Sequence, residues 1–303
     1  MRFEGLDLNL MVVFEALTET GNVTEAAKRL HLSQPSISAA LKRLREYFGD
    51  DLFTQVGRRM MPTAKAEALA PGVTELLNVA RYRICRPENF DAATSQRRFR
   101  LNASDYAFDI LVGKATARAA RSAPGVSFEI SQAGPENFRA FQQGDIDLLI
   151  TVPHYVLPEH PTEVLYSDVD AIICWNGSRF ADGISAEEFM DAEFAAAVFG
   201  AARRPTVSEI HFRKSGIDRN IVVEVPSFSA LPAAIVGTNR IAVMNRRHAL
   251  LFSRMYPLAV HALPVEGSNI SEIAQWHRLR GDDPGVQWLL QQLRDEVLEM
   301  HND

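Results

Sequence analysis

Residues 22–53 of this 303-residue chain read NVTEAAKRLHLSQPSISAALKRLREYFGDDLF. The first part has apolar residues three and four positions apart, which predicts a short amphipathic helix with Thr24 as its cap. After a break at residues 31–33, Ser33 is suited to cap a second helix. Pro35 can lie in its first turn, because the N–H that proline lacks has no helical partner there. The second helix therefore begins near Gln34, and the segment reads as two helices joined by a tight turn.

The second helix has one apolar face and one polar face. Its apolar face consists of Ile37, Leu41, Leu44 and Phe48. The other face carries hydrogen-bond donors and cations, the groups that contact base edges and phosphates when a helix enters the major groove of DNA. The residues expected to contact DNA from the turn and the helix are Thr24, Ser33, Gln34, Pro35, Ser36, Ser38, Lys42, Arg43 and Arg45.

A two-stranded wing is predicted directly after this helix. In the sequence LFTQVGRRMMPT, residues 52–63, Arg58 and Arg59 follow Gly57 and would hold the wing's turn against the phosphate backbone. Residues 28–65 carry eight Lys and Arg against three Asp and Glu, whereas the whole chain has a net charge of −6. A solvated basic face is the simpler interpretation of a single helix. Here two helices, a turn and a wing agree, and the positive charge is concentrated where DNA would bind.

These residues also resemble the LysR-type transcriptional regulators. The matching stretches are MRFEGLDLNLMVVFEAL at the start of the chain, AAKRLHLSQPSISAALKRLR and DDLFTQVGRRMMPT. They look most like the branch that contains the rhizobial nodulation regulators and the salicylate-responsive regulators of naphthalene catabolism. The resemblance is specific over residues 1 to about 65 and continues more weakly, for example in VEVPSF at residues 223–228. It implies a homodimer or homotetramer that binds DNA and responds to a small molecule.

The composition fits a small domain followed by a larger one. With 303 residues, 47% of them hydrophobic, the chain can bury more than one core. No stretch is as long and apolar as a membrane span, and the chain opens into an amphipathic helix rather than a signal sequence. We therefore expect a cytoplasmic protein that does not bind membranes. Cys85 and Cys174 stand in unrelated contexts, which predicts neither a disulfide nor a zinc site, and no cofactor is expected.

Residues 63–90 are predicted to form a linker helix capped by Thr63. Its apolar stripe could cover its own domain. A helix between two domains has little apolar surface of its own domain to pack against, however. A partner chain is therefore the more economical surface on which to bury the stripe. The resemblance implies the same, because the linker helix forms the dimer interface in LysR-type proteins. The stripe consists of Leu69, Val73, Leu76, Ala80 and Ile84.

Residues 91–303 alternate strand and helix patterns, which predicts a two-lobed α/β effector domain of the periplasmic-binding-protein type, with parallel sheets. We expect lobe I to comprise residues 91–162 and 268–303 and lobe II residues 163–267, with chain crossings near residues 162 and 268. The resemblance implies that the last helix, residues 284–300, returns to lobe I. The predicted fold is thus an N-terminal all-α winged helix-turn-helix domain at residues 1–62, the linker helix and this effector domain.

Such a domain binds its ligand in the crevice at the carboxyl ends of its strands, where loops and helix N-termini converge. Residues at those positions are candidates for effector contact. Ser104 and Ser227 are also good helix caps and would serve as caps without any ligand, so both interpretations stay open. The candidates are Ser104, Asp105, Thr151, Pro153, His154, Ser227 and Phe228.

Three further candidates could bind an aromatic anion. Arg246 and Arg247 follow a strand of the second lobe and could pair with a carboxylate or phenolate, and Trp276 on the returning strand could stack on a ring. A surface arginine pair is by default solvated charge, and which arginine faces the cleft stays open. Salicylate-responsive relatives have an arginine and a Trp-His pair at the matching positions and a hydroxyl residue at that of Ser104. Val169 stands where they carry a histidine, which leaves the identity of the effector open.

The sequence thus predicts a transcriptional regulator, an activator of an aromatic-compound catabolic pathway. Its expected partners are a double-stranded DNA operator and a small, anionic aromatic effector, and RNA polymerase is a further candidate. The alternatives are a sensor of a non-aromatic metabolite or a repressor. A two-lobed small-molecule-binding protein would not carry the N-terminal basic helices. An enzyme is not expected, because the chain has neither GxGxxG nor GxSxG, and Gly113-Lys114 lacks the upstream glycine of a P-loop.

Overall fold

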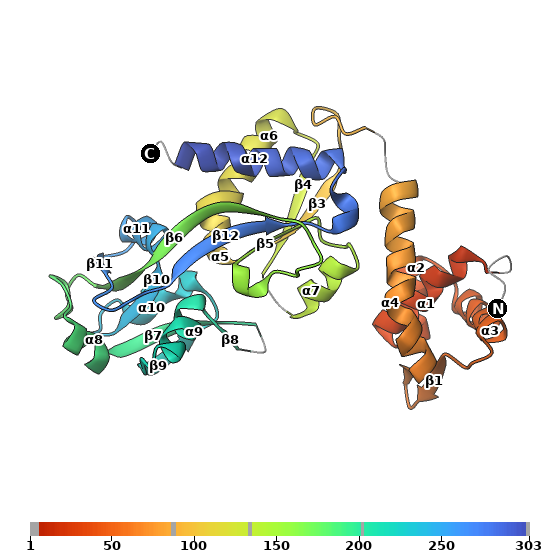
Figure 1. The fold of residues 1–303 in the computed structure, drawn as a ribbon, viewed down its shortest axis with the longest axis horizontal. Coiled ribbons are helices and arrows are strands. Elements are labelled where there is room, and N and C mark those ends of the chain that lie inside the picture. Colours follow the sequence, from red (N-terminus) through yellow and green to blue (C-terminus); the bar gives the residue numbers. More distant parts are fainter. Residues whose placement is uncertain (1–5, 86–88, 133–134, 201–202, 301–303) are drawn as a thin grey trace. The chain divides into compact units, whose positions relative to one another are not determined.

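The computed structural model describes residues 6–85, 89–132, 135–200 and 203–300 (Figure 1). The chain divides into two compact units, Met1–Pro87 and Glu88–Asp303, and each is described by itself. Within the described ranges, no helix is both long enough and apolar enough to cross a membrane.

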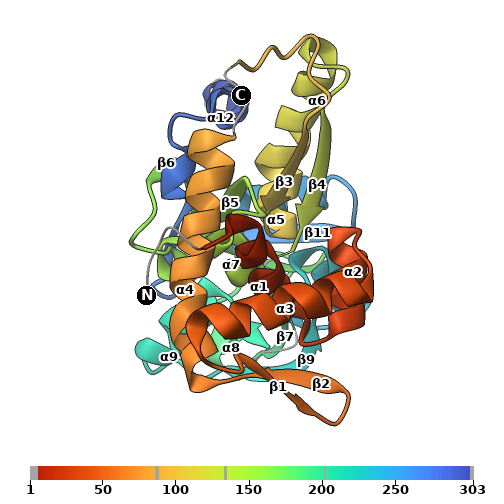
Figure 2. The same cartoon turned by 90° about the vertical axis from the view of Figure 1, so that its right-hand side faces the viewer.

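The first unit is a winged helix-turn-helix, with its two-stranded wing at one end of the helices (Figure 2). As predicted, α3 begins at Gln34 with Pro35 in its first turn. Ser33 caps it, since the Ser33 hydroxyl accepts a hydrogen bond from the backbone N–H of Ser36 at 3.2 Å. The elements are α1 (Leu8–Thr20), α2 (Val23–Leu30), α3 (Gln34–Phe48), β1 (Phe53–Val56), β2 (Arg59–Pro62), α4 (Ala64–Val79) and a π-helical turn that continues α4 (Ala80–Ile84).

The cap of α2 is Asn22, so the prediction of Thr24 as the cap is wrong. Asn22 Oδ1 accepts hydrogen bonds from the backbone N–H groups of Thr24 and Glu25, at 2.8 and 3.2 Å. The side chain of asparagine satisfies the free N–H groups of a helix start as well as that of threonine, and Asn22 stands where the backbone is still extended. Thr24 lies inside the first turn, which leaves its hydroxyl available for a contact with α3.

Helix α4 packs against the core of its own unit. Val73 is buried with residues of α1, and Leu69 and Leu76 are half-buried against the same core. We expected this helix to have little apolar surface of its own unit to pack against. That expectation is wrong for most of its apolar stripe, which packs on the core of the first unit. Ile84, at the end of the π-helical turn, differs from these residues because its side chain is 75% exposed.

The second unit has two α/β lobes. Its strands lie in the order β4-β3-β5-β12-β6-β10-β7-β8, with β11 beside β6 and β9 beside β7. The strands are β3 (Arg98–Asn102), β4 (Ser127–Ser131), β5 (Leu148–Thr151), β6 (Thr162–Trp175), β7 (Glu193–Phe199), β8 (Arg204–Pro205), β9 (Asn220–Val225), β10 (Ile241–Asn245), β11 (Leu258–Ala262) and β12 (Asn269–Gln275). The α-helices are α5 (Asp105–Ala107), α6 (Gly113–Ser122), α7 (Pro135–Gln142), α8 (Ala186–Asp191), α9 (Val207–Lys214), α10 (Leu231–Ile235), α11 (Arg246–Ser253) and α12 (Pro284–Met300).

Two long strands join the lobes. β6 and β12 pair antiparallel from Thr162 opposite Gln275 to Val169 opposite Asn269. From Asp170 onward, β6 pairs with β10 and β11 instead. The chain therefore crosses into lobe II within β6, after Val169, rather than near residue 162, because one continuous strand belongs to both lobes. The chain returns to lobe I at the start of β12, where Asn269 lies opposite Val169.

The sheet is mixed, so the prediction of parallel sheets is only partly right. β3 is parallel to β4 and β5, and β7 is parallel to β9 and β10. β12 is antiparallel to β5 and β6, and β6 is antiparallel to β10. A strand buried on both faces has the same run of apolar residues in either direction, so the sequence pattern does not reveal its orientation.

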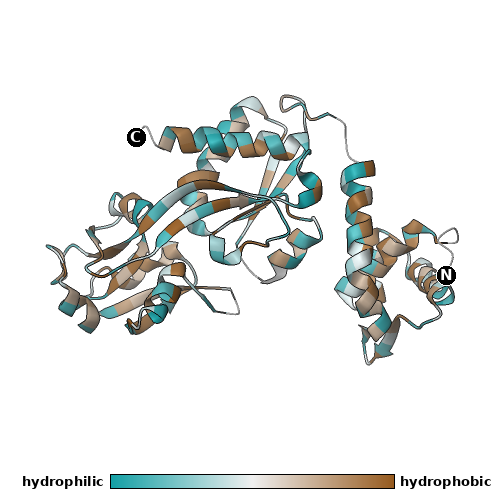
Figure 3. Cartoon of the chain, in the orientation of Figure 1, coloured by the Kyte–Doolittle hydropathy of each residue, from teal (hydrophilic) through white to brown (hydrophobic). Residues whose placement is uncertain are grey.

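The largest core of this unit lies between the sheet and its helices. Helix α12 has the predicted bounds and buries Val286, Leu289 and Leu293 in this core. Figure 3 shows apolar segments along β6 and an alternation of apolar and polar residues on α12. The helix thus covers lobe I with its apolar face, which returns the end of the chain to the lobe where this unit begins.

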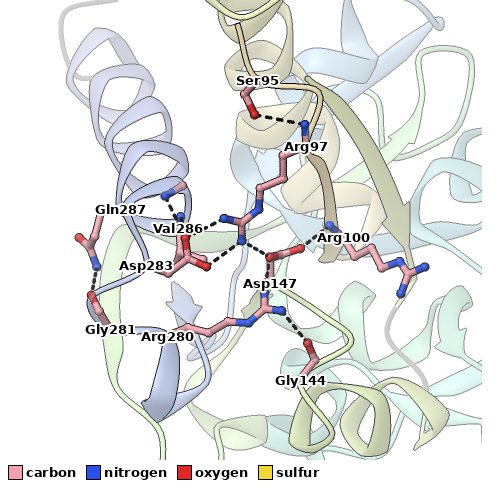
Figure 4. Close-up of polar contacts among 11 residues, drawn as sticks. Ser95, Arg97, Arg100, Gly144, Asp147, Arg280, Gly281, Asp283, Val286 and Gln287 are labelled. Carbon is pink, nitrogen blue, oxygen red and sulfur yellow. Dashed lines mark hydrogen bonds and ion pairs between the residues drawn. The ribbon is translucent and has the colours of Figure 1, made fainter. Parts of the chain in front are cut away.

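A buried charged network holds lobe I together (Figure 4). The Asp147 carboxylate accepts hydrogen bonds from Arg97 Nη2 at 2.8 Å, from the Arg280 guanidinium, and from the backbone N–H of Arg100 at 2.8 Å. Arg97 also forms a bidentate pair with Asp283, at 2.7 and 2.9 Å. The network joins the start of β3 to the start of α12. Its stability depends on complete pairing, because a buried charge without a partner is strongly destabilising.

Asp147→Ala should lower the free energy of unfolding of this unit by about 3–5 kcal/mol, since it removes the carboxylate that pairs with the buried Arg280 guanidinium and with Arg97. Urea denaturation followed by tryptophan fluorescence measures this unit alone, because Trp175, Trp276 and Trp288 all lie in it. The matched control is Asp182→Ala, at an exposed aspartate, with an expected change within about 0.5 kcal/mol. Equal unfolding midpoints for the two variants would contradict this role of the network.

Candidate nucleic-acid interface and ligand cavity

The polar face of α3 is open to solvent. Gln34, Ser36, Ser38 and Lys42 are exposed, and the Lys42 side chain is 79% exposed, with Nζ 3.9 Å from a carboxylate oxygen of Glu46. At that distance and exposure the ion pair is weak, so Lys42 can exchange it for a phosphate. Gln34, Ser36 and Ser38 carry polar side chains that can contact base edges. The cation of Lys42 follows one turn further along the helix.

Thr24 orients the first of these side chains. The Thr24 hydroxyl accepts a hydrogen bond from Gln34 Nε2 at 3.0 Å. This contact fixes the amide plane of Gln34 and leaves its carbonyl oxygen and one N–H for another partner, such as an adenine edge. Thr24 is thus placed to position Gln34 across the turn between α2 and α3.

Two of the predicted DNA-contacting arginines have structural partners. Arg45 Nε donates to the backbone carbonyl of Asp51 at 2.8 Å, and its Nη2 donates to that of Phe53 at 2.6 Å. Arg45 therefore fastens α3 to the first strand of the wing. Arg43 Nη2 lies 3.1 Å from a carboxylate oxygen of Asp7, ahead of α1. A helix pattern identifies an outward cation but not the carbonyl or carboxylate that folding brings beside it.

The wing presents its arginines to solvent. Gly57 and Arg58 form the turn between β1 and β2, where Gly57 has a φ of +63°, a conformation that favours glycine. Arg58 and Arg59 are exposed, and within the described residues neither guanidinium has a hydrogen-bond or ion-pair partner. Both are therefore available to contact phosphates.

The second unit has a cavity of about 90 Å³ between its lobes. It lies at the carboxyl ends of six strands, where open α/β sheets bind ligands. Its walls combine aromatic and aliphatic side chains with a few polar groups, as is typical of small-molecule sites. The lining residues are Ser104, Asp105, Tyr106, Gln132, Ile150, Thr151, Val152, Tyr155, Phe199, Pro205, Thr206, Val207, Ser208, Phe228, Asn245, Ile270 and Glu272.

Four predicted effector contacts line this cavity: Ser104, Asp105, Thr151 and Phe228. Ser104 also caps α5, since its hydroxyl accepts a hydrogen bond from the backbone N–H of Ala107 at 3.1 Å. Three others lie next to lining residues but do not line the cavity themselves. They are Ser227, whose side chain makes no cap, and the exposed Pro153 and His154, which share one 3₁₀ turn with Tyr155.

The two predicted arginines do not reach this cavity. Arg246 and Arg247 line a separate, open depression of about 550 Å³, together with Ser167, Val169 and Leu250. The chain turns into helix α11 at Arg246, so Asn245, at the end of β10, is the last residue here that lines the cavity. The expectation that one crevice joins these arginines to Ser104 is therefore wrong.

Trp276 lies one residue beyond the end of β12, at the lobe I end of that strand. It is half-buried against the main core, and its backbone N–H donates to the carbonyl of Pro161 at 3.3 Å. Trp276 does not line the cavity either, because the strand that carries it runs past the crevice before reaching this residue. The three residues predicted to hold an aromatic anion are thus not gathered around one ligand.

Several lining residues were missed from the sequence. Phe199 and Asn245 lie at the carboxyl ends of strands that were predicted. The expectation that residues at strand ends line the crevice therefore applied to them as well. Tyr155 lies just beyond the predicted His154. Tyr106 and Glu272 carried no local signal, because only the alternation of a correctly placed strand or helix reveals which side chains point inward.

Polar contacts across the cavity connect the lobes. From α5, the Asp105 carboxylate accepts hydrogen bonds from the backbone N–H and the hydroxyl of Ser229, both at 2.7 Å. One helical turn later, Asp109 lies 2.9 Å from Nε2 of His248, which is fully buried. Burial lowers the pKa of His248 below its ordinary value, against the opposing effect of Asp109. These contacts hold the start of α5 against lobe II.

Comparisons with known proteins agree with this architecture. Residues 8–67 match the description "Bacterial regulatory helix-turn-helix protein, lysR family", and residues 92–298 match "LysR substrate binding domain". The chain is 39% identical to Nodulation protein D 2 of Rhizobium tropici, over 98% of this chain and 95% of that protein. It is 37% identical to Nodulation protein D 1 of Rhizobium meliloti strain 1021, over 98% and 97% of the two chains.

Among solved structures, a probable transcriptional regulator from Pseudomonas aeruginosa is 28% identical, with a TM-score of 0.64 over 96% of this chain and 97% of that one. CbnR, solved in complex with its target DNA, has a TM-score of 0.52 over 96% and 100% of the chains, at 16% identity, and shows the shared fold alone.

The chain combines a winged helix-turn-helix with a two-lobed α/β unit that has a cavity between its lobes. This combination in a single polypeptide defines a class of bacterial transcriptional regulators. The family matches cover both units, and the relatives match nearly the whole chain. The chain belongs to the LysR family of transcriptional regulators, which are not enzymes. Among the described residues, no group of three or more His, Cys, Asp or Glu side chains is placed to hold a metal ion.

If Lys42 neutralises one phosphate, Lys42→Ala should weaken binding to every duplex alike and reduce the slope of log K against log salt by about one. Gln34→Ala and Ser36→Ala should instead relax base preference. The measurement is fluorescence anisotropy over a salt series, with a duplex selected from a random pool and a scrambled duplex. Lys214→Ala, an exposed lysine of the second unit, is the control. Unchanged binding by the Gln34, Ser36 and Lys42 triple variant would remove α3 as the recognition helix.

Proposed function

We propose that this LysR-family regulator reads an operator through α3 and its wing and responds to a small aromatic compound bound between the lobes of its second unit. In this proposal the protein activates genes of an aromatic-compound pathway. The observation that carries the proposal is the cavity at the carboxyl ends of six strands, lined from both lobes. A ligand there would contact residues whose relative positions depend on how the lobes are arranged.

The walls of the cavity favour an aromatic ligand. Phe199 and Phe228 lie with their ring centroids 5.3 Å apart, and Tyr106 lies 6.5 Å from Phe228, both edge to face. Ile150 and Ile270 add aliphatic surface. A flat ring that joins such a cluster gains contact area and a favourable ring geometry. Polar side chains at Ser104, Thr151 and Asn245 can fix its substituents.

The ligand need not be an anion. That expectation relied on an arginine in the crevice, and the described lining residues include no Lys, Arg or His. A carboxylate in this cavity would lose its hydration without gaining a cation. Phenols and other uncharged hydroxylated rings fit the lining better than salicylate-like anions do.

Control of transcription would follow from different ligand affinities in different arrangements of the subunits. LysR proteins oligomerise, and we propose that this chain pairs through α4 and the turn that follows it, where Ile84 is exposed. A symmetric dimer implies an operator with two related half-sites. RNA polymerase is the expected further partner of an activator.

A second candidate function concerns the genes controlled. The relatives of 37–39% identity are named nodulation proteins, which favours control of nodulation genes over control of a catabolic pathway. The two proposals share the same cavity and differ in the regulated genes. The positions of the selected operators in the source genome distinguish them.

Phe199→Ala should weaken binding of an aromatic ligand by about tenfold, because it removes one wall of the ring cluster. Titration calorimetry on the full-length protein, with a panel of phenols, salicylates and flavonoids, measures this loss. Phe108→Ala is the matched control, because Phe108 is exposed and does not line the cavity. If a compound that binds the wild type binds both variants equally well, the ligand lies elsewhere.

A further inference from the structure

Among the described residues, one acidic side chain of the cavity has no hydrogen-bond or ion-pair partner. Glu272 lies on β12, directly opposite Tyr166 of β6, and is only 3% exposed. A β-bulge follows it, between Glu272 and Ile273. Bulges redirect the side chains beside them and occur often next to binding sites. The strand thus brings a buried carboxyl group to the wall of the cavity.

The neighbouring acids on the same face of these strands are fully engaged. The Asp168 carboxylate accepts hydrogen bonds from the Tyr106 hydroxyl at 2.8 Å and from the backbone N–H of Arg247 at 3.0 Å. Asp170 accepts them from Ser208 and Ser268. Glu272 differs, because within the described residues nothing donates a hydrogen bond or offers a positive charge to its carboxyl group.

The groups around Glu272 favour its neutral form. Tyr166 and Asp168 face it from β6 and Tyr106 faces it from α5, and none of these groups is a cation. Burial first, and the negative charge of Asp168 second, raise the pKa of Glu272 to about 8. At neutral pH the group therefore retains its proton and is a carboxylic acid with one O–H donor and a free carbonyl oxygen.

We propose that Glu272 is the specificity residue of the ligand site: its protonated carboxyl group donates a hydrogen bond to an oxygen of an uncharged aromatic ligand and excludes the corresponding carboxylate. This inference depends on the proposed ligand cavity and goes further by naming the charge state of the ligand and the residue that selects it. Among the described residues no group forms a hydrogen bond with this carboxyl group, so a ligand oxygen would complete its hydrogen bonding. A carboxylate would instead lie beside Glu272 and Asp105, and the described lining residues offer it no cation.

The test uses two ligands of matched shape, 2-naphthamide and 2-naphthoate, which differ in charge. Titration calorimetry on the full-length protein between pH 6.5 and 9.5 should give about tenfold or tighter binding of the amide at pH 7. Affinity for the amide, which does not titrate in this range, should fall by about tenfold per pH unit above about 8, as Glu272 loses its proton. In Glu272→Gln, whose amide N–H can replace the O–H donor, this dependence on pH should vanish. Glu266→Gln, at an exposed glutamate, is the control and should keep the wild-type profile.

The other outcomes distinguish a failure of the role of Glu272 from a failure of the proposed ligand cavity. If the carboxylate binds as tightly as the amide, or if Glu272→Gln keeps the wild-type pH profile while Phe199→Ala still weakens binding, the ligand cavity stands and the role of Glu272 is overturned. If Phe199→Ala leaves amide binding intact, the ligand site itself is wrong. If neither compound binds at millimolar concentration, the inference is overturned as well.

Discussion

The antiparallel pairing of β6 with β12 determines where the rest of the second unit can lie. These strands carry the chain into lobe II and back, and they are hydrogen-bonded to each other over the register from Thr162 to Val169. Each lobe adds its remaining strands at one end of this pair, so the carboxyl ends of both sets converge beside it. The cavity, the inter-lobe contacts and the row of buried acids follow from this pairing.

The same pairing explains why acids are buried where a core would be expected. Alternate residues of a strand share a face, so Asp168 and Asp170 of β6 lie on the side that also carries Ile270 and Glu272 of β12. Asp168 and Asp170 receive hydrogen bonds from both lobes, which specifies how the lobes meet. Glu272 receives none, and a buried group of this kind costs stability that packing elsewhere must offset. Such a cost is common where a protein keeps a group ready for a ligand.

The sequence predicted most elements because their signals are local. Ser33 with Pro35 marked the start of α3, Gly57 marked the turn of the wing, and the apolar spacing of residues 284–300 marked α12. Apart from the cap of α2, which was placed two residues too late, the errors concern contacts that form only when separate elements fold together. Arg45 was read as an outward cation because no local pattern shows that the carbonyls of Asp51 and Phe53 fold against it.

In the ligand site too, local sequence signals predicted some residues, whereas contacts that form only on folding determined the others. Ser104, Thr151 and Phe228 were predicted from the rule that strand ends meet at one crevice, and the structure gathers them there. Arg246 satisfied the same rule in sequence but begins a helix that carries it to another surface. Glu272 lies in the middle of a strand, where only the register between β6 and β12 reveals that it faces the cavity.

The central claim is that a ligand binds against the two crossing strands and thereby acts on both lobes. Hydrogen–deuterium exchange of the full-length protein, with and without a saturating uncharged aromatic ligand, tests it directly. The account predicts slower exchange in Thr162–Trp175 and Asn269–Gln275, together with the first turn of the helices that begin at Asp105 and Val207. Protection confined to the depression around Arg246 and Leu250, or unchanged exchange in both crossing strands, would contradict it.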